Sequence, residues 1–335
     1  MQAHKSRRAV HRWNPVRGLI PDSQNPEPFE VIGVSAGVNR WTGGRVDGWT
    51  EGLTAWTAGA SDGGLGRSIF DFPVAIRPPE QLVFRPSTRP PVKGQIIAMG
   101  GGGFSMERGN PLLDDYVLAQ SRRRRPRVCF LGCASGDSAA YVEKFYRAFS
   151  QRSCEPTHLP MFDTPPPDIA RIVPRQDIFY VGGGSTRNLL VLWREWGLDR
   201  LLAREWRRGK VFAGLSAGSL CWFDSGVSDS FGPQLAPVRA LGWLAGSHCP
   251  HYDGEAARRP AYHALVLSGE LAAGYAADDG AALHFIGRKL YRVVSSRPDA
   301  KAYRVSRSGG TVLEQSLETE FLGAARKRGR AGRPR

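Results

Sequence analysis

Four short apolar segments, each followed by a turn of small residues and separated by helical stretches, constrain the fold of this 335-residue chain more than any other feature. The segments are 95–99, 127–132, 177–181 and 210–214. Apolar strands that alternate with amphipathic helices favour a parallel sheet that is covered on both faces. We therefore predict an α/β fold of three layers, with a mostly parallel sheet between two layers of helices.

The turns after three of these strands carry residues suited to binding a ligand. Glycine-rich turns at 100–103 and 182–184 follow the first and third strands, and Ser216 follows the fourth. Because ligands of such sheets bind beyond the carboxyl ends of the strands, we expect the two turns and Ser216 to meet at one edge.

Ser216 lies at the centre of the pattern Gly214-Leu215-Ser216-Ala217-Gly218, which is typical of a nucleophile at a sharp turn between a strand and a helix. Small neighbours leave room for the strained backbone, and the N-terminus of the next helix, expected over 219–223, favours negative charge on the serine oxygen. The alternative is a turn in which Ser216 only caps a helix. The apolar strand before the serine favours catalysis.

A nucleophilic serine needs a base and an acidic residue that orients the base. His251 is our candidate base, because Pro250 fixes the loop before it and polar residues follow. His248 lies three residues earlier with Asp253 nearby, but no second cluster completes a metal site, so we expect no metal. The acidic residue remains open. The candidates are Asp278, Asp279, Asp224 and Asp229.

Composition divides the chain into three parts. Residues 1–94 are rich in Gly, Pro, Trp and Ser, and we interpret them as a low-order extension that ends in a Pro-rich linker. We expect the enzyme domain to span 95–324. Residues 325–335 form a basic tail, in which we count six Lys and Arg and no acidic residue.

The net charge of +15 is concentrated partly in this tail. A basic tail attracts polyanions without specificity, so we expect no nucleic-acid partner beyond that attraction. No apolar run is long enough to span a membrane. Because the basic N-terminus leads into Trp13-Asn14-Pro15 and not into an apolar stretch, we expect no secretory signal. Five cysteines without zinc-site spacing indicate free thiols in a reducing cytoplasm.

Five motifs, taken together, resemble the peptidase E (aspartyl dipeptidase) and cyanophycinase family of serine peptidases. They are Ile96 to Gly102, Tyr180 to Thr186, Gly214 to Gly218, Cys249 to Asp253 and Ala277 to Ala282. The resemblance covers roughly 95–320. It implies a fold like that of the class I glutamine amidotransferases and an enzyme that needs no metal or organic cofactor.

Carried onto the matching positions, the resemblance implies that Ser216 is the nucleophile, His251 the base and Asp279 the acidic partner, with Asp229 in reserve. It also implies an oxyanion hole, for which the candidate amides are those of Gly183, Gly184 and Ala217.

The resemblance further implies an Asp-directed dipeptidase acting on short peptides. Binding an aspartyl side chain requires a cation, and Arg187, Arg258 and Arg259 are the candidates. The alternatives are a cyanophycinase-like exopeptidase, another amide hydrolase, or a binding module that keeps the fold without catalysis. The sequence does not predict the oligomeric state.

Overall fold

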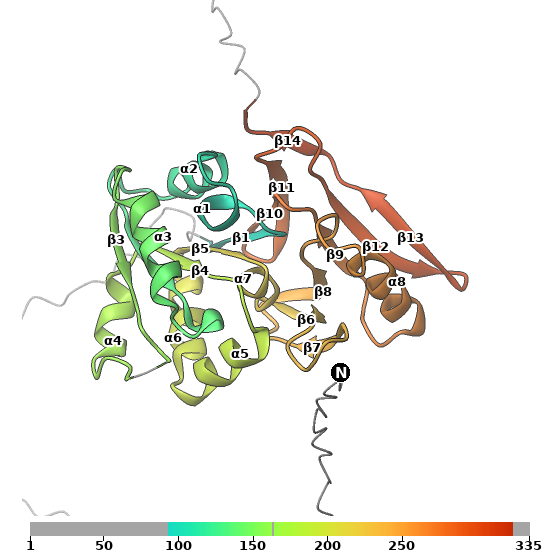
Figure 1. Ribbon diagram of the computed structural model, residues 1–335, viewed down its shortest axis with the longest axis horizontal. Coiled ribbons are helices and arrows are strands. Elements are labelled where there is room, and N and C mark those ends of the chain that lie inside the picture. Colours follow the sequence, from blue (N-terminus) through green and yellow to red (C-terminus); the bar gives the residue numbers. More distant parts are fainter. Residues whose placement is uncertain (1–92, 163, 324–335) are drawn as a thin grey trace, which may run out of the picture. The chain divides into compact units, whose positions relative to one another are not determined.

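The computed structural model describes residues 93–162 and 164–323 (Figure 1). The interpretation of 1–94 as a low-order extension concerns residues outside this range, apart from 93 and 94. The expectation for the basic tail also lies outside the described residues.

The main sheet has eight strands in the order β14-β11-β10-β1-β5-β4-β2-β3. Their bounds are β1 Gln95–Met99, β2 Arg127–Leu131, β3 Glu155–His158, β4 Ile178–Val181, β5 Val211–Leu215, β10 Ala281–Ile286, β11 Lys289–Ser295 and β14 Thr319–Phe321. The run from β1 to β3 is parallel, and β10 pairs antiparallel with both β1 and β11. The four strands expected from the sequence form the centre of this sheet, within one residue of the predicted ends.

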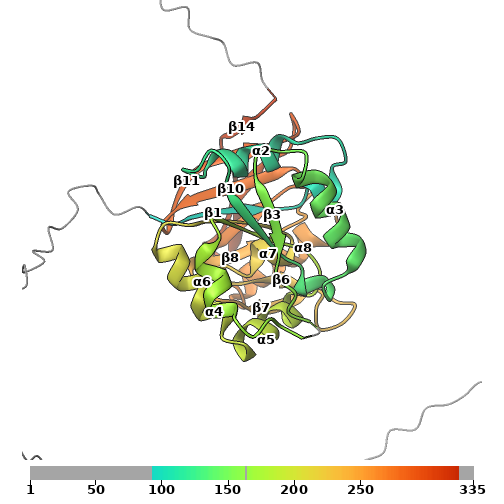
Figure 2. The same cartoon turned by 90° about the vertical axis from the view of Figure 1, so that its left-hand side faces the viewer.

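Helices cover both faces of the parallel strands (Figure 2). The bounds are α1 Gly103–Met106, α2 Leu112–Ala119, α3 Ala139–Phe149, α4 Ile169–Ile172, α5 Thr186–Glu195 and α6 Leu198–Arg207. In β1, Ile97 and Met99 pack in one core with residues of α1 to α3, whereas Ile96 and Ala98 pack in another with residues of α4 to α6. Strands buried on both faces are continuously apolar. The predicted three-layer α/β fold is confirmed.

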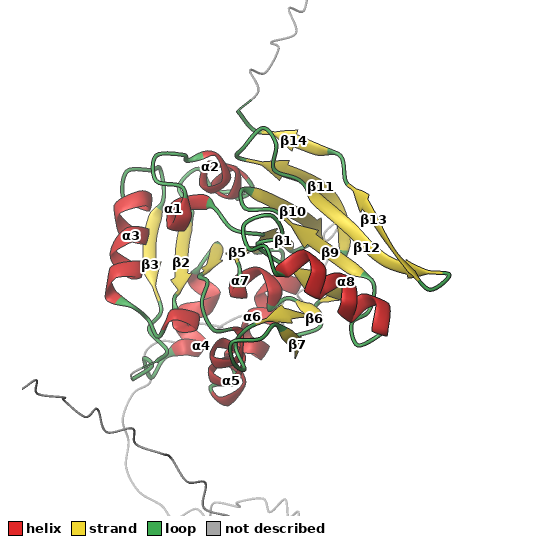
Figure 3. Cartoon of the chain, turned by 45° about the vertical axis from the view of Figure 1, so that its right-hand side comes forward, coloured by secondary structure: helices red, strands yellow, loops and turns green. Residues whose placement is uncertain are grey.

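A second sheet of six strands was not predicted. Its order is β13-β12-β9-β8-β6-β7, and it packs beside helix α8 (Figure 3). The bounds are β6 Phe223–Ser228, β7 Ala236–Arg239, β8 Leu244–Cys249, β9 Gly274–Ala277, β12 Ala302–Ser308, β13 Thr311–Ser316 and α8 Arg258–Ser268.

The helix expected over 219–223 is wrong in its extent: α7 spans Ala217–Leu220, and Phe223 already begins β6. Phe223 and Leu220 are both buried in the same core, so the chain turns into the second sheet there.

Candidate active site

Ser216 has an unusual backbone conformation between β5 and α7, with φ 54° and ψ −120°. A non-glycine residue with positive φ is strained, and such residues persist only where their surroundings hold them. Here the Ser216 amide donates to the carbonyl of Met99 in β1 at 3.3 Å, and the Ser216 carbonyl accepts from the amide of Leu220 at 2.9 Å. The serine is thus fixed from the strand side and from the helix side.

The two glycines of the motif are required by packing. A Cβ atom on Gly214 would lie 2.2 Å from the carbonyl oxygen of Gly218, and one on Gly218 would lie 2.3 Å from the carbonyl oxygen of Val181 in β4. Both distances are impossible for real atoms. The spacing Gly-x-Ser-x-Gly therefore follows from how closely the turn packs on itself and on β4.

His251 and Asp279 form a close pair. Nδ1 of His251 lies 2.6 Å from Oδ1 of Asp279, and each side chain is 12% exposed. His251 follows β8 in the second sheet and also has a positive φ of 54°. Asp279 lies between β9 and β10, where its amide donates to Oδ1 of Asp253 at 2.7 Å. An orienting carboxylate on one ring nitrogen leaves the other nitrogen to act as a base.

Glycines also confine the carboxylate of Asp279. A Cβ on Gly101 would lie 2.1 Å from Oδ1, and a Cβ on Gly254 would lie 2.3 Å from Oδ2. The carbonyl of Gly101 accepts from the amide of Gly280 at 3.0 Å. Because Gly101 is two residues after Met99, the strand that fixes Ser216 also fixes the acidic partner of His251.

The other acidic candidates contact different groups. Oδ2 of Asp278 accepts from the amide of Lys301 at 3.0 Å, and burial raises the pKa of Asp278 to about 6. Asp224 accepts from the amide of Gly246 at 2.8 Å. Asp229, the reserve candidate, is 62% exposed and lies 4.0 Å from Arg258. Among the four candidates, Asp279 alone contacts His251.

His248 belongs to a buried network under Ser216 that the sequence analysis missed. Burial lowers the pKa of His248 to about 3, so the ring is neutral near pH 7. Its Nδ1 faces the carbonyl of Tyr275 at 3.2 Å and must donate, which leaves Nε2 as an acceptor for the Ser219 hydroxyl at 3.1 Å. The same hydroxyl lies 2.8 Å from the carbonyl of Ser216. The Ser219 hydroxyl has one proton, which it can donate either to Nε2 of His248 or to the carbonyl of Ser216.

We predict that Ser219→Ala lowers kcat about fivefold and leaves KM unchanged, because one hydrogen bond at the turn, worth about 1 kcal/mol, is lost. Steady-state kinetics on a short peptide measures both constants. Ser268→Ala, at the exposed end of α8, is the matched control. Equal kcat values for Ser219→Ala and wild type would show that this hydroxyl does not position Ser216.

The glycine-rich turn after β4 lies against Ser216. A Cβ on Gly183 would lie 3.2 Å from Cβ of Ser216. The Gly183 amide donates to the hydroxyl of Tyr141 in α3 at 3.2 Å, a contact that the helical pattern of α3 did not reveal. The amides of Gly184 and Ala217 donate to no other residue within the described part of the chain.

The three candidate arginines differ in their surroundings. Arg258 is buried, donating to Glu255 at 2.7 Å and to the carbonyl of Val227 at 3.1 Å. Arg259 lies over the rings of Tyr252 and Tyr303 and 3.6 Å from Glu314. Arg187 extends from the first turn of α5 over the exposed ring of Phe231, at 5.1 Å from its centre.

Contacts thus hold Arg258 and Arg259 within the fold, and Arg187 is the candidate that follows directly on the glycine-rich turn. The structure adds one cation that the sequence analysis missed. Arg297 is hydrogen-bonded to Glu107, which raises its pKa, and Asp279 and Asp253 contribute to the same rise.

The described residues contain neither a cluster of metal-binding side chains nor a helix that could span a membrane. Within 93–162 and 164–323, no three His, Cys, Asp or Glu side chains are grouped to hold a metal ion. None of the helices in these two ranges has the length and apolar content to cross a membrane.

Comparison with known proteins identifies the chain. The model of peptidase family S51 matches residues 96–293. The chain is 57% identical over 229 residues to the uncharacterized peptidase YgaJ of Bacillus subtilis. The aligned region covers 68% of this chain and 99% of that protein. The protein is a serine-type peptidase with a peptidase E-like α/β fold. It belongs to peptidase family S51.

One solved structure agrees in fold. A peptidase from an acI-B1 Actinobacterium superposes with a TM-score of 0.50 at 19% identity, covering 68% of this chain and 96% of that chain. A candidate peptidase E protein from Listeria monocytogenes EGD-e gives a TM-score of 0.42 at 18% identity, covering 67% and 99%.

Proposed function

We propose that this peptidase hydrolyses short Asp-containing peptides, as an Asp-directed dipeptidase, through an acyl-enzyme on Ser216. The observation that carries the proposal is the joint placement of two features on β1. Met99 accepts from the amide of the strained Ser216, and Gly101 confines the carboxylate that contacts His251. The strand thereby ties a nucleophile candidate to its base and acid.

In this mechanism, Oγ of Ser216 attacks the scissile carbonyl carbon while Nε2 of His251 takes the hydroxyl proton. Asp279 holds Nδ1–H of the ring and stabilises the imidazolium. When the C–N bond breaks, His251 returns the proton to the leaving amine. Water, activated by the same nitrogen, then attacks the ester and releases Ser216. No step uses a metal or an organic cofactor.

The tetrahedral oxyanion would be bound by backbone amides at the edge where β4 and β5 end. Gly184 and Ala217 supply amides that are uncommitted among the described residues. The Gly183 amide would transfer its hydrogen bond from Tyr141 to the oxyanion, as catalytic hydrogen bonds in free enzymes often tighten only with substrate.

Arg187 is our proposed contact for the aspartyl carboxylate. It is the second residue of α5, two residues after Ser185, and its planar guanidinium can bind a carboxylate through two hydrogen bonds. A short peptide is the only partner that this mechanism requires. We place the enzyme in the cytoplasm, because all five cysteines are buried free thiols, as expected in a reducing compartment.

A fluorophosphonate label with peptide mapping tests the nucleophile, and a substrate panel tests the specificity. We expect modification at Ser216 and faster cleavage of α-linked Asp-X dipeptides than of their Asn-X counterparts or of β-Asp-Arg. Labelling of another serine in an active preparation would contradict the mechanism. A preference for β-Asp-Arg would instead favour the cyanophycinase-like alternative.

A further inference from the structure

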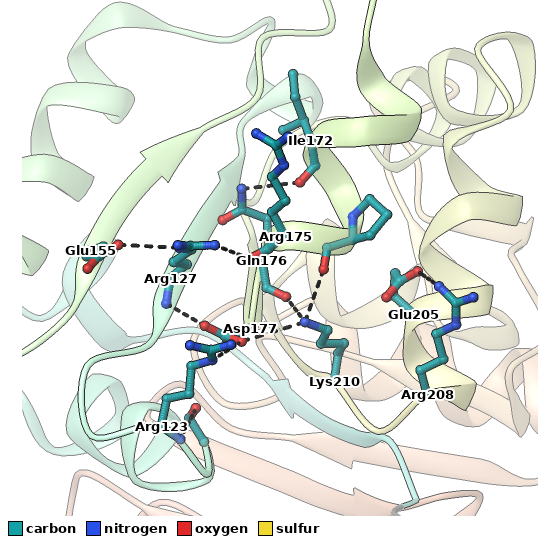
Figure 4. A network of polar contacts seen from close by, with 12 residues as sticks. Arg123, Arg127, Glu155, Ile172, Arg175, Gln176, Asp177, Glu205, Arg208 and Lys210 are labelled. Carbon is teal, nitrogen blue, oxygen red and sulfur yellow. Dashed lines mark hydrogen bonds and ion pairs between the residues drawn. The ribbon is translucent and has the colours of Figure 1, made fainter. Parts of the chain in front are cut away.

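The edge of the main sheet opposite Ser216 carries a concentration of positive charge. Ser216 follows the carboxyl end of β5, whereas Lys210 precedes the amino end of the same strand. Arg175 and Asp177 precede β4, and Arg125 comes shortly before β2. Figure 4 shows Lys210, Arg175 and Asp177 in this region.

Two neighbouring hollows lie at this edge. One has a volume of about 370 Å³ and the other about 180 Å³, and both are lined by Ser121 and Arg123. Six cations line the two hollows, and we call them the basic edge: Arg122, Arg123, Arg124, Arg152, Arg208 and Lys210. Asp115 and Asp177 are the two carboxylates in the same linings, so cations outnumber acids by three to one.

Ion pairs neutralise only part of this charge. Four of the six cations are paired: Arg123 at 3.1 Å and Lys210 at 3.6 Å share Asp177, Arg152 lies 2.9 Å from Asp115, and Arg208 lies 2.8 Å from Glu205. Arg122 and Arg124 are exposed and form no ion pair with another described residue. An arginine run held at the surface, next to hollows already rich in cations, attracts a polyanion.

We propose that the basic edge binds the phosphodiester backbone of a nucleic acid, in a role separate from peptide hydrolysis. The cations lie near the amino ends of β5, β2 and β3, and β4 lies between β5 and β2 in the sheet. Neighbouring strands are about 4.8 Å apart, so these ends extend over about 14 Å. Along duplex DNA one strand presents a phosphate about every 3.4 Å. The edge therefore matches a row of about four phosphates, and guanidinium groups bind phosphate through two hydrogen bonds.

Other occupants fit less well. A membrane surface calls for exposed apolar side chains beside the cations, but the exposed large apolar residues of the described chain lie outside these linings.

Charge also disfavours the two ends of the chain itself as occupants of the basic edge. Residues 1–92 contain 11 basic and 8 acidic side chains, and 324–335 contain six basic and none acidic. Like charge opposes their docking on the basic edge.

From the sequence, an attraction for polyanions was expected at the tail; the folded domain carries a basic surface of its own. The lining residues contain no exposed aromatic side chain on which a base could stack. Contacts to the backbone alone give binding that depends little on base sequence and strongly on salt. A duplex, which presents phosphates on its outside, is the form that such an edge fits.

Fluorescence anisotropy with a labelled 20-base-pair duplex, measured on the full chain over a range of salt concentrations, tests the proposal. The edge variant Arg122→Gln/Arg124→Gln breaks no ion pair to another described residue, so folding is preserved. The matched control, Arg326→Gln/Arg328→Gln, removes the same charge from the tail. We expect the edge variant to weaken binding at least about tenfold and to lower the slope of log affinity against log salt by about 2, at about 0.9 per lost phosphate contact.

The control variant should change affinity less, and both should keep wild-type kcat/KM on a peptide, which separates this proposal from the proposed function. Wild-type affinity in the edge variant would overturn the proposal, as would a loss confined to the tail variant. Edge-dependent binding to phosphatidylserine vesicles that is tighter than duplex binding would also overturn it. So would displacement of the duplex by polyglutamate at equal charge concentration.

Discussion

Ser216→Ala is expected to reduce kcat/KM on an Asp-X dipeptide by roughly 10⁴- to 10⁶-fold, because the variant lacks the atom that forms the acyl-enzyme. Residual hydrolysis would come from the oxyanion amides and from binding alone. The expected KM is close to that of wild type, since Oγ contributes little to binding the ground state. Stopped assays with long incubations measure the remaining rate.

The variant should remain folded. Alanine keeps the Cβ of Ser216, and the hydrogen bonds that hold this residue run through its main chain to Met99 and Leu220. A melting temperature within a few degrees of wild type is therefore the necessary companion result. Activity within tenfold of wild type would remove Ser216 from the role of nucleophile.

Asp279→Asn is expected to lower kcat about 10⁴-fold near neutral pH. The amide can donate to Nδ1 of His251, which favours the tautomer with the proton on Nε2, and that nitrogen then cannot accept the proton of Ser216. A profile of kcat against pH measures the loss. Activity should recover in part at high pH, where hydroxide replaces the missing base.

Asp278→Asn is the matched control for this prediction. Its carboxyl is adjacent in sequence but accepts from Lys301 and lies near Tyr303, not His251. We expect a change of less than tenfold in kcat. Equal losses in the two variants would mean that either carboxylate can serve His251, or that both act through the fold.

Much of the central sheet could be predicted from the sequence. The parallel strands β1, β2, β4 and β5 are buried on both faces and are therefore short, continuous apolar runs in the sequence. The small residues after β1, β4 and β5 predicted the edge of the sheet at which a ligand binds. At Gly214 and Gly218 the residues must be small, because the close approach of the backbone leaves no room for a Cβ atom. His251 was preferred on local grounds, and the structure places it beside a carboxylate.

The second sheet could not be predicted in the same way. β7 has only four residues and β13 is largely exposed, so neither carries a clear alternation of apolar and polar residues. The choice between Asp278 and Asp279 was open for a related reason. Neighbouring residues in extended backbone point in opposite directions, and the sequence alone does not fix which one faces the histidine.

Contacts between distant segments were also beyond the sequence. The hydroxyl of Tyr141 in α3 accepts from the amide of Gly183, 42 residues away. The cations of the basic edge come from several separate segments, between Arg122 and Lys210, that meet only when β2 to β5 align. Their net charge was visible in the composition, but its concentration was not.

The nucleophile candidate and its base come from different sheets. Ser216 follows a strand of the main sheet and Asp279 is joined to the same sheet through Gly101, whereas His251 follows β8 in the second sheet. The main sheet can therefore be intact while His251 is displaced from the serine. On heating, activity is then lost when the two packed layers separate. This loss of activity precedes the loss of helical signal that marks complete unfolding.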